Sequence, residues 1–250
     1  MAAQATRWQL EGDAACLSCG PLTGRVDADG RGVRFTVATW QGELSDAFGV
    51  LISAGPGPRP AVIEVAERYV RGQDFVATYA KSTEFPVAPH FYWRATLHEP
   101  AAVQIEMIMS VQTDLLDSNP EATVNSFALE SRLFCASALQ EDAFQEIASG
   151  PQPISLDCSA SQEYLILFRN EDLRLSYAQM VHPSDYVAME IQAAESRPWL
   201  VTSTLFPEQL EKGVIRRGRI SGWFLPAEND LETAVKLARQ FVEEPLPLTT

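Results

Sequence analysis

The chain has 250 residues, of which 46% are hydrophobic, and it carries a formal net charge of −14. A chain of this length and composition can bury a full core, which excludes an intrinsically disordered protein. Its 33 acidic residues outnumber 19 basic ones. This balance argues against a nucleic-acid partner, because binding to a phosphate backbone requires clustered Lys and Arg.

The N-terminal segment 1–13 contains no apolar run, so no signal peptide is expected. Charged residues interrupt the apolar runs elsewhere every few positions, so no segment is expected to span a membrane. A cytoplasmic location follows as an expectation. In that compartment the four cysteines are expected to be reduced thiols.

Alternating patterns predict strands in the first part of the chain, at 6–11, 32–41 and 48–53, with a turn at 27–32 (DADGRG). Residues 61–71 and 73–81 predict a hairpin around Gly72, with a bulge near Ala66 where the alternation slips. A helix over 61–70 is the competing interpretation. The β-branched residues and the immediate glycine turn favour the strand.

The clearest alternation covers residues 89–99 (PHFYWRATLHE). Successive side chains of a strand point to opposite faces, so one face is apolar and the other polar. The apolar face consists of Phe91, Trp93, Ala95 and Leu97. Residues 101–113 alternate almost as regularly, and the intervening Glu99 and Pro100 indicate a second hairpin.

The second half repeats this pattern. Strands are predicted at 164–169, 173–180, 186–192, 199–206 and 213–225. Residues 126–136 fit either a strand or a helix, and 139–148 favour a helix. Near the C-terminus, Asn229 and Glu232 have the spacing of a capping box, and Pro245 marks the end of the helix that follows. The apolar stripe of this helix comprises Leu231, Val235, Ala238, Phe241 and Val242.

We therefore predict a mainly β protein, a large antiparallel β-sandwich with an amphipathic C-terminal helix. The sequence is treated as one domain, 1–250, with a weak subdivision near 120–160, and two stacked β units are the alternative. At the level of architecture alone, the chain is similar to the large β-sandwiches that handle carbohydrates, mutarotase-like ones included. This likeness concerns the fold, and no functional residue is carried over from it.

The polar face of 89–99 is the first candidate site. His90, Tyr92 and Arg94 lie on one side of the strand. Arginine can bind a carboxylate or phosphate, histidine can transfer a proton near neutral pH, and tyrosine can stack on a sugar. The alternative is the solvent-facing half of a strand with aromatic cross-strand contacts. At roughly 3.3 Å per residue, His90 and His98 lie roughly 26 Å apart, too far to share a metal ion.

A cluster of arginines in the strand at 213–225 is the second candidate. Arg217 and Arg219 are expected to point with Ser221 and to form a local basic patch, whereas Arg216 points away. Such a patch can bind an anion. The structural alternative is protection of a sheet edge, or cross-strand pairing with carboxylates.

Metal sites have weaker support. Cys16 and Cys19 form a CxxC pair, which can be half of a zinc site or a redox dithiol, but no second pair is present and Cys135 and Cys158 are isolated. A group of oxygen-bearing side chains lacks the spacing and central glycine of an EF-hand. This group comprises Asp114, Asp117, Asn119 and Glu121. No metal site and no cofactor is therefore predicted.

Nucleotide-binding, hydrolase and zincin motifs are absent, namely GxGxxG, GxxxxGK[ST], GxSxG and HExxH. The leading hypothesis is a non-catalytic protein that binds a small molecule, a sugar or a partner through His90, Tyr92 and Arg94, extended by Tyr69 and Tyr79. The alternative is a sugar-directed, mutarotase- or epimerase-like enzyme with His90 as general acid and an unidentified Glu as base. A homo-oligomer that associates through a sheet face is a third hypothesis.

Overall fold

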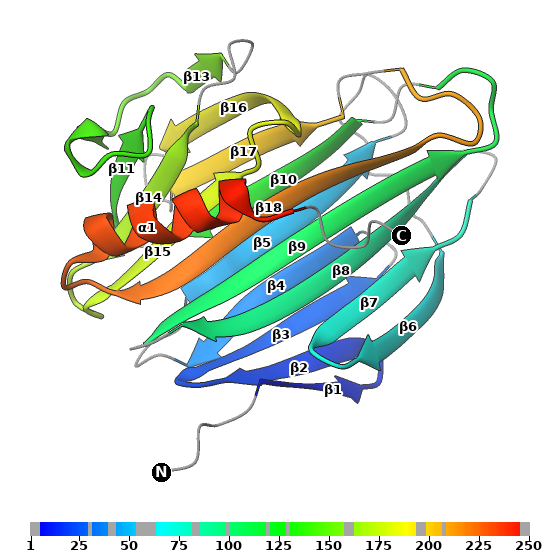
Figure 1. Ribbon diagram of the computed structural model, residues 1–250, viewed down its shortest axis with the longest axis horizontal. Coiled ribbons are helices and arrows are strands. Elements are labelled where there is room, and N and C mark those ends of the chain that lie inside the picture. Colours follow the sequence, from blue (N-terminus) through cyan, green and yellow to red (C-terminus); the bar gives the residue numbers. More distant parts are fainter. Residues whose placement is uncertain are drawn as a thin grey trace.

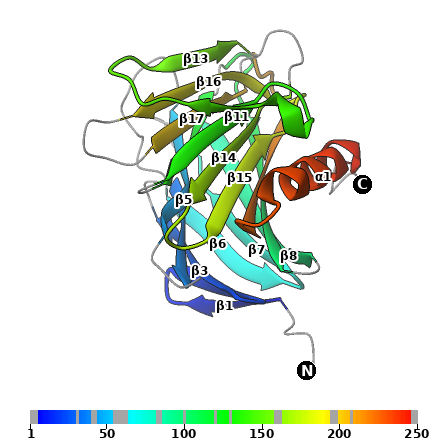
Figure 2. The ribbon, with the colours of Figure 1, turned by 90° about the vertical axis from the view of Figure 1, so that its left-hand side faces the viewer.

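The computed structural model describes residues 6–29, 32–39, 44–53, 64–81, 86–98, 101–118, 121–128, 131–157, 163–193, 199–206 and 209–245. In this part of the chain two antiparallel sheets of nine strands each are stacked face to face. A single α-helix lies on the outer side of one sheet (Figures 1 and 2). The predicted β-sandwich with a C-terminal helix is confirmed.

The first sheet, here called sheet A, is built mainly from the N-terminal strands. In spatial order its strands are β1 (Arg7–Glu11), β2 (Ala14–Cys19), β3 (Leu22–Asp29), β4 (Gly32–Thr39), β5 (Leu44–Ser53), β10 (Glu121–Ala128), β17 (Trp199–Leu205), β16 (Tyr186–Ala193) and β13 (Ile154–Asp157). Consecutive hairpins form the first five strands, and later parts of the chain complete the sheet.

The second sheet, here called sheet B, carries the candidate site. In spatial order its strands are β12 (Phe144–Ile147), β11 (Arg132–Ala136), β14 (Leu165–Asn170), β15 (Leu175–Val181), β18 (Ile215–Pro226), β9 (Ala102–Thr113), β8 (Val87–His98), β7 (Asp74–Tyr79) and β6 (Val65–Arg71). The long strands β8, β9 and β18 lie side by side (Figure 1). Side chains of β8 and β18, although far apart in sequence, therefore lie on the same face of sheet B.

The main core lies between the two sheets. Phe91, Trp93 and Ala95 of β8 are fully buried there, as their alternation predicted. The sheets approach closely at Gly218, where an added Cβ would lie 3.3 Å from atoms of Leu205 and Phe206. A larger side chain at this position would push the two sheets apart.

Helix α1 (Asp230–Glu243) covers part of the outer face of sheet B, against β14, β15 and β18 (Figure 2). Its predicted apolar stripe is confirmed, because Val235, Ala238 and Phe241 are buried in this second core. The predicted capping box is wrong. Asn229 has left-handed backbone angles, with φ of 57°, and its side chain makes no capping hydrogen bond.

Asp230 instead organises the start of the helix. Its carboxylate accepts the backbone N–H of Leu231 at 2.8 Å and two hydrogen bonds from Arg169 of β14, at 2.8 and 2.5 Å. Ser176 of β15 donates a further hydrogen bond to it. The start of the helix is therefore anchored by side chains of the sheet below it rather than by a local cap.

The hairpin predictions hold where the structure describes them. β6 and β7 are joined by a turn at Gly72, and the pairing register shifts between Val65 and Glu67, which places the predicted bulge at Ala66. A strand rather than a helix forms over Val65–Arg71, and residues 61–63 lie outside the described part. β8 and β9 pair from Val87 opposite Thr113 to His98 opposite Ala102, which confirms the second hairpin.

Three predictions of local structure are wrong. Strands β2 and β3 were not predicted. β3 includes the first half of the turn expected at 27–32, and residues 30 and 31 of that turn lie outside the described part. Residues 126–136 do not form one element, since they end β10 in sheet A and form β11 in sheet B. The helix expected at 139–148 is a short 3₁₀ turn, Glu141–Ala143, followed by β12. Pairing of β12 with β11 overrides the local preference there.

Candidate functional site

Strands β7, β8, β9 and β18 lie next to one another in sheet B, and α1 lies beside their outer face (Figure 1). Many side chains on this face are polar. Side chains of directly paired residues point to the same side of a sheet, so each set of cross-strand neighbours forms a row. One set crosses all four strands and consists of Asp74, Arg94, Glu106 and Ser221. Another, here called the open row, lies further along the strands and consists of Thr78, His90, Ser110 and Arg217.

Between these two sets lies a middle row of mixed character. Tyr92 pairs with Val76 on β7 and with Ile108 on β9, and Ile108 pairs with Arg219 on β18. Tyr69 of β6 is opposite Val76 and extends this row to the sheet edge. The face therefore places two tyrosine rings in line, with an arginine at the other end of the row.

Arg94 and Arg219 are both bound to buried carboxylates, and the four side chains form what is here called the paired network. Arg94 donates from Nε and Nη2 to the two carboxylate oxygens of Asp74, at 2.8 and 3.0 Å, and this contact raises the pKa of Arg94. Arg219 donates from Nε to Oε1 of Glu106 at 2.9 Å, and its Nη2 lies 2.8 Å from the same oxygen. Each carboxylate of this network is therefore neutralised by an arginine.

Neutral polar side chains next to the network are also bonded to one another. The Nε2 atom of His98 lies 2.6 Å from Oε1 of Gln104, and Nε2 of Gln104 donates to the Ser221 hydroxyl at 2.9 Å. Because an amide oxygen can only accept, the proton of this contact is assigned to Nε2 of His98. This end of the face is therefore internally satisfied.

The C-terminal end of α1 closes over Arg219. The guanidinium carbon lies 4.6 Å from the centre of the Phe241 ring, and Nη1 donates to the backbone carbonyl of Glu244 at 3.2 Å. The carbonyl end of a helix favours a cation, and an aromatic face attracts one. His182 packs edge-on against the same ring, at 5.6 Å between ring centres. Arg219 is thus held in place by the helix as well as by Glu106.

The open row differs from the paired network in the bonding of its side chains. All four of its side chains are half-buried. Within the described ranges, no hydrogen bond or ion pair involves the side chain of Thr78, His90, Ser110 or Arg217. Two hydroxyls, an imidazole and a guanidinium thus share one row and make no side-chain bond to any residue that the structure describes. Such groups are available to a ligand at no cost to existing contacts.

Burial lowers the pKa of His90 below its usual value, and the charge of nearby Lys81 lowers it further. Its imidazole is therefore predominantly neutral at pH 7, with one nitrogen as donor and the other as acceptor. A neutral imidazole is suited to accept a proton or a hydrogen bond. The expectation that His90 acts as a general acid fits this environment less well than a role as base or hydrogen-bond partner.

All five residues predicted as a binding site lie on this outer face: His90, Tyr92, Arg94, Arg217 and Arg219. The structure divides them into two groups. Arg94 and Arg219 belong to the paired network, whereas His90, Tyr92 and Arg217 make no recorded side-chain bond in the described part of the chain. The two strands that carry them are separated only by β9.

The sequence analysis did not single out Asp74, Glu106 or Gln104, and it misplaced Tyr79. Tyr79 is 2% exposed and packs edge-on against Phe91 in the main core, so it faces away from the site. A signal for Glu106 was present, because it lies on the polar side of a strand whose other side is apolar. Its partner, 113 residues away, gave no local signal.

The two thiols of the CxxC pair lie on one strand, β2, on opposite faces. Cys19 is buried in the main core, whereas Cys16 is half-buried on the other side. In this strand the two thiols cannot converge on one ion or form a bond to each other. Among the acidic residues near the end of β9, Asp114 is bound to Lys81 at 2.7 Å. Cys158 and Asn119 lie outside the described residues.

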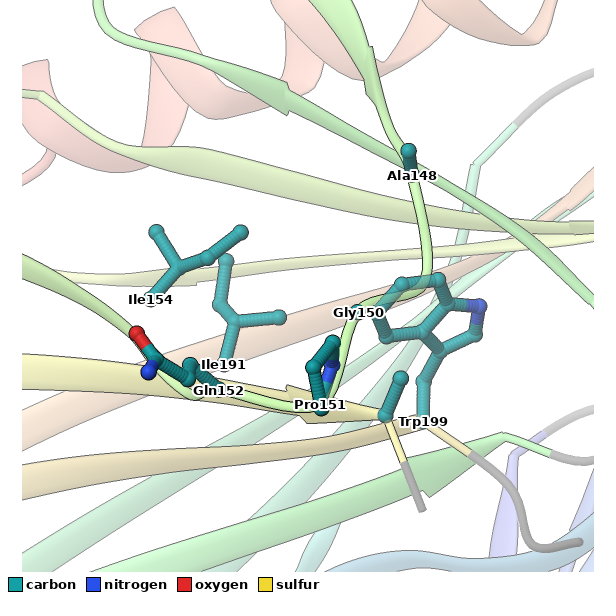
Figure 3. A pocket seen from close by; sticks show the side chains of 8 residues that line it. Ala148, Gly150, Pro151, Gln152, Ile154, Ile191 and Trp199 are labelled. Atoms are coloured by element: carbon teal, nitrogen blue, oxygen red, sulfur yellow. The ribbon is translucent and has the colours of Figure 1, made fainter. Parts of the chain in front are cut away.

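A small cavity of about 270 Å³ lies elsewhere, between the connection from β12 to β13 and strands β16 and β17 of sheet A (Figure 3). Its lining is largely apolar and includes Ile154, Ile191 and Trp199. The indole N–H of Trp199 donates to the carbonyl of Ser131 at 2.9 Å. None of the predicted site residues contributes to this cavity.

Among the described residues, no helix is long and apolar enough to cross a membrane.

No family model matches the chain, and no curated protein matches it. Solved structures do. A putative aldose 1-epimerase from Klebsiella pneumoniae is 8% identical, with a TM-score of 0.56 over 98% of this chain and 90% of its own. The α-N-acetylgalactosaminidase NagBb from Bifidobacterium bifidum is 11% identical, with a TM-score of 0.53 over 94% of this chain but only 38% of its own. At these identities the likeness extends to the fold alone: the chain has the β-sandwich architecture of these structures.

Proposed function

We propose that this protein is a non-catalytic carbohydrate-binding protein whose ligand lies on the outer face of sheet B, over the open row and Tyr92. The observation that carries the proposal is a row of polar side chains, beside a tyrosine ring, that make no bond to one another or to other described residues. A sugar offers hydroxyls that both donate and accept hydrogen bonds, and an apolar ring face that packs on an aromatic side chain. The open row and Tyr92 supply partners for both surfaces.

The pairing of the carboxylates supports a binding role rather than acid–base catalysis. Asp74 and Glu106 are the buried carboxylates of this face, and each accepts hydrogen bonds from an arginine. A general base must reach the proton that it removes, and its lone pairs must be available. Glu106 is also four positions from Ser110 along β9, roughly 13 Å from the open row.

The fold comparison supports the class of ligand. Both solved structures described above are named for enzymes that act on sugars. A shared fold alone does not define a function, so this support is secondary to the chemistry of the face.

Binding is tested by thermal unfolding in the presence of a panel of mono- and disaccharides, followed by calorimetric titration of any sugar that raises the melting temperature. A ligand that binds only the folded protein stabilises it by mass action. We expect Tyr92→Ala and His90→Ala to abolish the shift. Gln145→Ala, on exposed β12 at the opposite edge of sheet B, should leave it unchanged. A shift that survives in both site variants, or no shift with any sugar, contradicts the proposal.

A second candidate function, a mutarotase-like enzyme, is favoured by one observation. The similarity to the putative aldose 1-epimerase from Klebsiella pneumoniae covers 98% of this chain. In this case His90, predominantly neutral at pH 7, would serve as a base. Polarimetry separates the two candidates: the enzyme would accelerate mutarotation of α-D-glucose or α-D-galactose, and His90→Ala would remove the acceleration. A rate equal to that of buffer alone rejects the enzyme and leaves the binding proposal in place.

A further inference from the structure

The open row has an electropositive surrounding, although the chain as a whole has a net charge of −14. Arg217 lies at one end of the row, and His90 lies two strand spacings away, about 10 Å across the sheet. Lys81 is close enough to His90 to lower the pKa of its imidazole. The short side chain of Ser110 lies between the arginine and the histidine.

The surrounding carboxylates do not cancel these charges. Asp114 is bound to Lys81, and both Lys81 and Lys212 contribute to lowering the pKa of Asp114, so two lysines share one carboxylate. Lys212 directly precedes Gly213, whose backbone N–H donates to the carbonyl of Thr113 at the end of β9. Lys81, Lys212 and Arg217 therefore lie toward this end of the face, and among the described residues the recorded ion pair there is that of Lys81 with Asp114.

Seven arginines of the described chain have a recorded acidic partner, and Arg217 is not among them. The partnered residues, with the corresponding acids, are Arg25 with Asp27, Arg68 with Asp13, Arg94 with Asp74, Arg132 with Glu146, Arg169 with Asp230, Arg174 with Glu228 and Arg219 with Glu106. A half-buried guanidinium with no acidic partner among the described residues, beside two hydroxyls and an imidazole, is a donor set suited to oxyanions.

We infer that the open row is an anion site, in which Arg217, Ser110 and His90 bind the phosphate or carboxylate group of an acidic carbohydrate. The guanidinium provides the charge and two directed N–H donors. The Ser110 hydroxyl and the imidazole N–H approach the same anion from the middle and far side of the row. Tyr92, one row away, then lies beside the sugar ring. This inference rests on the proposed carbohydrate-binding function and specifies its ligand class as sugar phosphates or uronic acids.

The test is calorimetric titration at low ionic strength with neutral sugars, their 6-phosphates, their uronates and inorganic phosphate. Glucose and galactose serve as the parent sugars. We expect the acidic sugars to bind at least about tenfold more tightly than the neutral ones, since charge-assisted hydrogen bonds are the stronger class. The advantage should fall as salt is added. Comparison of phosphate with uronate identifies which acidic group the site prefers.

Variants separate this inference from the function on which it rests. Arg217→Gln should remove the advantage of the acidic sugars, so that acidic and neutral sugars bind this variant with similar affinity. Tyr92→Ala should weaken both. Arg174→Gln, which removes an exposed arginine on the turn between β14 and β15, is the matched control and should change neither.

Each outcome decides the anion site and the carbohydrate-binding function separately. If neutral and acidic sugars bind equally, or if the advantage persists in Arg217→Gln, the anion site is rejected and the carbohydrate function stands. If no sugar binds but inorganic phosphate binds in a manner that depends on Arg217, the anion site stands and the carbohydrate function is rejected. If neither sugars nor phosphate bind, both are rejected.

Discussion

Arg219 and Glu106 form an ion pair in which the side chains are only 1% and 6% exposed. The two residues come from adjacent strands, β18 and β9, and lie 113 positions apart in sequence. Phe241 and the carbonyl of Glu244 enclose the guanidinium from the side of α1. The pair thus connects the polar face of sheet B to the end of the helix, and each charge depends on the other for compensation.

Removal of one partner of this pair should be costly. We expect Glu106→Leu or Arg219→Met alone to reduce the free energy of unfolding by about 3–5 kcal/mol, because the remaining charge loses its buried partner. After Glu106→Leu, the carboxylate left near Arg219 is that of exposed Glu244, 3.9 Å from Nη2. The double variant Glu106→Leu/Arg219→Met should recover most of this loss, since two apolar side chains replace two charges. Urea denaturation of the four proteins measures the coupling.

The exposed pair Arg25 and Asp27 provides the comparison, with side chains 49% and 40% exposed. Arg25→Met should cost less than about 1 kcal/mol, as is usual for surface pairs. If the single variants of Arg219 and Glu106 lower the free energy of unfolding by no more than Arg25→Met does, the buried pair does not stabilise the fold as described.

The start of α1 gives a second prediction, in which two adjacent residues should behave in opposite ways. Asp230→Ala should lower the free energy of unfolding by roughly 3 kcal/mol, because it leaves Arg169 without its carboxylate beneath the helix. Asn229→Gly should be nearly neutral, since glycine adopts the left-handed conformation readily and no side-chain cap is lost. Thermal and urea unfolding measure both. A loss in Asn229→Gly as large as that in Asp230→Ala would contradict the assignment of the helix start to Asp230.

The sequence predicted the long strands of sheet B well because their alternation is strong and local. In β8 and β9 the apolar positions follow period two with Ile108 as the exception, and burial agrees with it at Phe91, Trp93 and Met107. Strands β2 and β3 were missed because small and polar residues dominate them. They become strands by pairing with β1 and β4, a non-local condition that local patterns do not contain.

The candidate site was predictable only in its composition. Alternation placed His90, Tyr92 and Arg94 on one face, and Arg217 and Arg219 on one face of another strand. Only the sheet order brings these strands together, with β9 between them. The sequence also could not distinguish bonded from unbonded arginines. Glu106 neutralises Arg219, and the choice of this partner depends on register rather than on residue type.

The thiols provide a third prediction. Burial raises the pKa of Cys135 to about 12, and it also raises the pKa values of Cys19 and Cys16. Because the thiolate is the reactive form, a raised pKa slows alkylation. We expect iodoacetamide at pH 8 to modify half-buried Cys16 first, whereas Cys19 and Cys135 should react only after unfolding. Mass spectrometry of the peptides gives the rates, and labelling in urea serves as the reference. Equal native rates at Cys16 and Cys135 would contradict the assigned burial.

The last prediction concerns His90 and pH. Burial is the main reason that the pKa of His90 is lowered from its usual value of 6.5, and Lys81 adds to it. The unfolded chain therefore binds this proton at a higher pH than the folded protein does. It follows that the stabilising contribution of neutral His90 is complete above about pH 6.5 and is lost as the pH falls through the folded-state pKa.

Urea denaturation between pH 7.5 and 5 should show this loss, and His90→Gln should flatten the corresponding part of the curve. The charged groups around the imidazole are Lys81, Asp114 and Arg217. Lys81→Met should raise the pKa of His90 and so narrow the pH range over which stability is lost. NMR titration of the imidazole measures this pKa directly. Binding of an anion to the open row should raise the same pKa, because it favours the imidazolium, so affinity for phosphate should increase as the pH falls. If His90 of the free protein titrates at or above 6.5, its environment is not the one described, and both pH dependences should be absent.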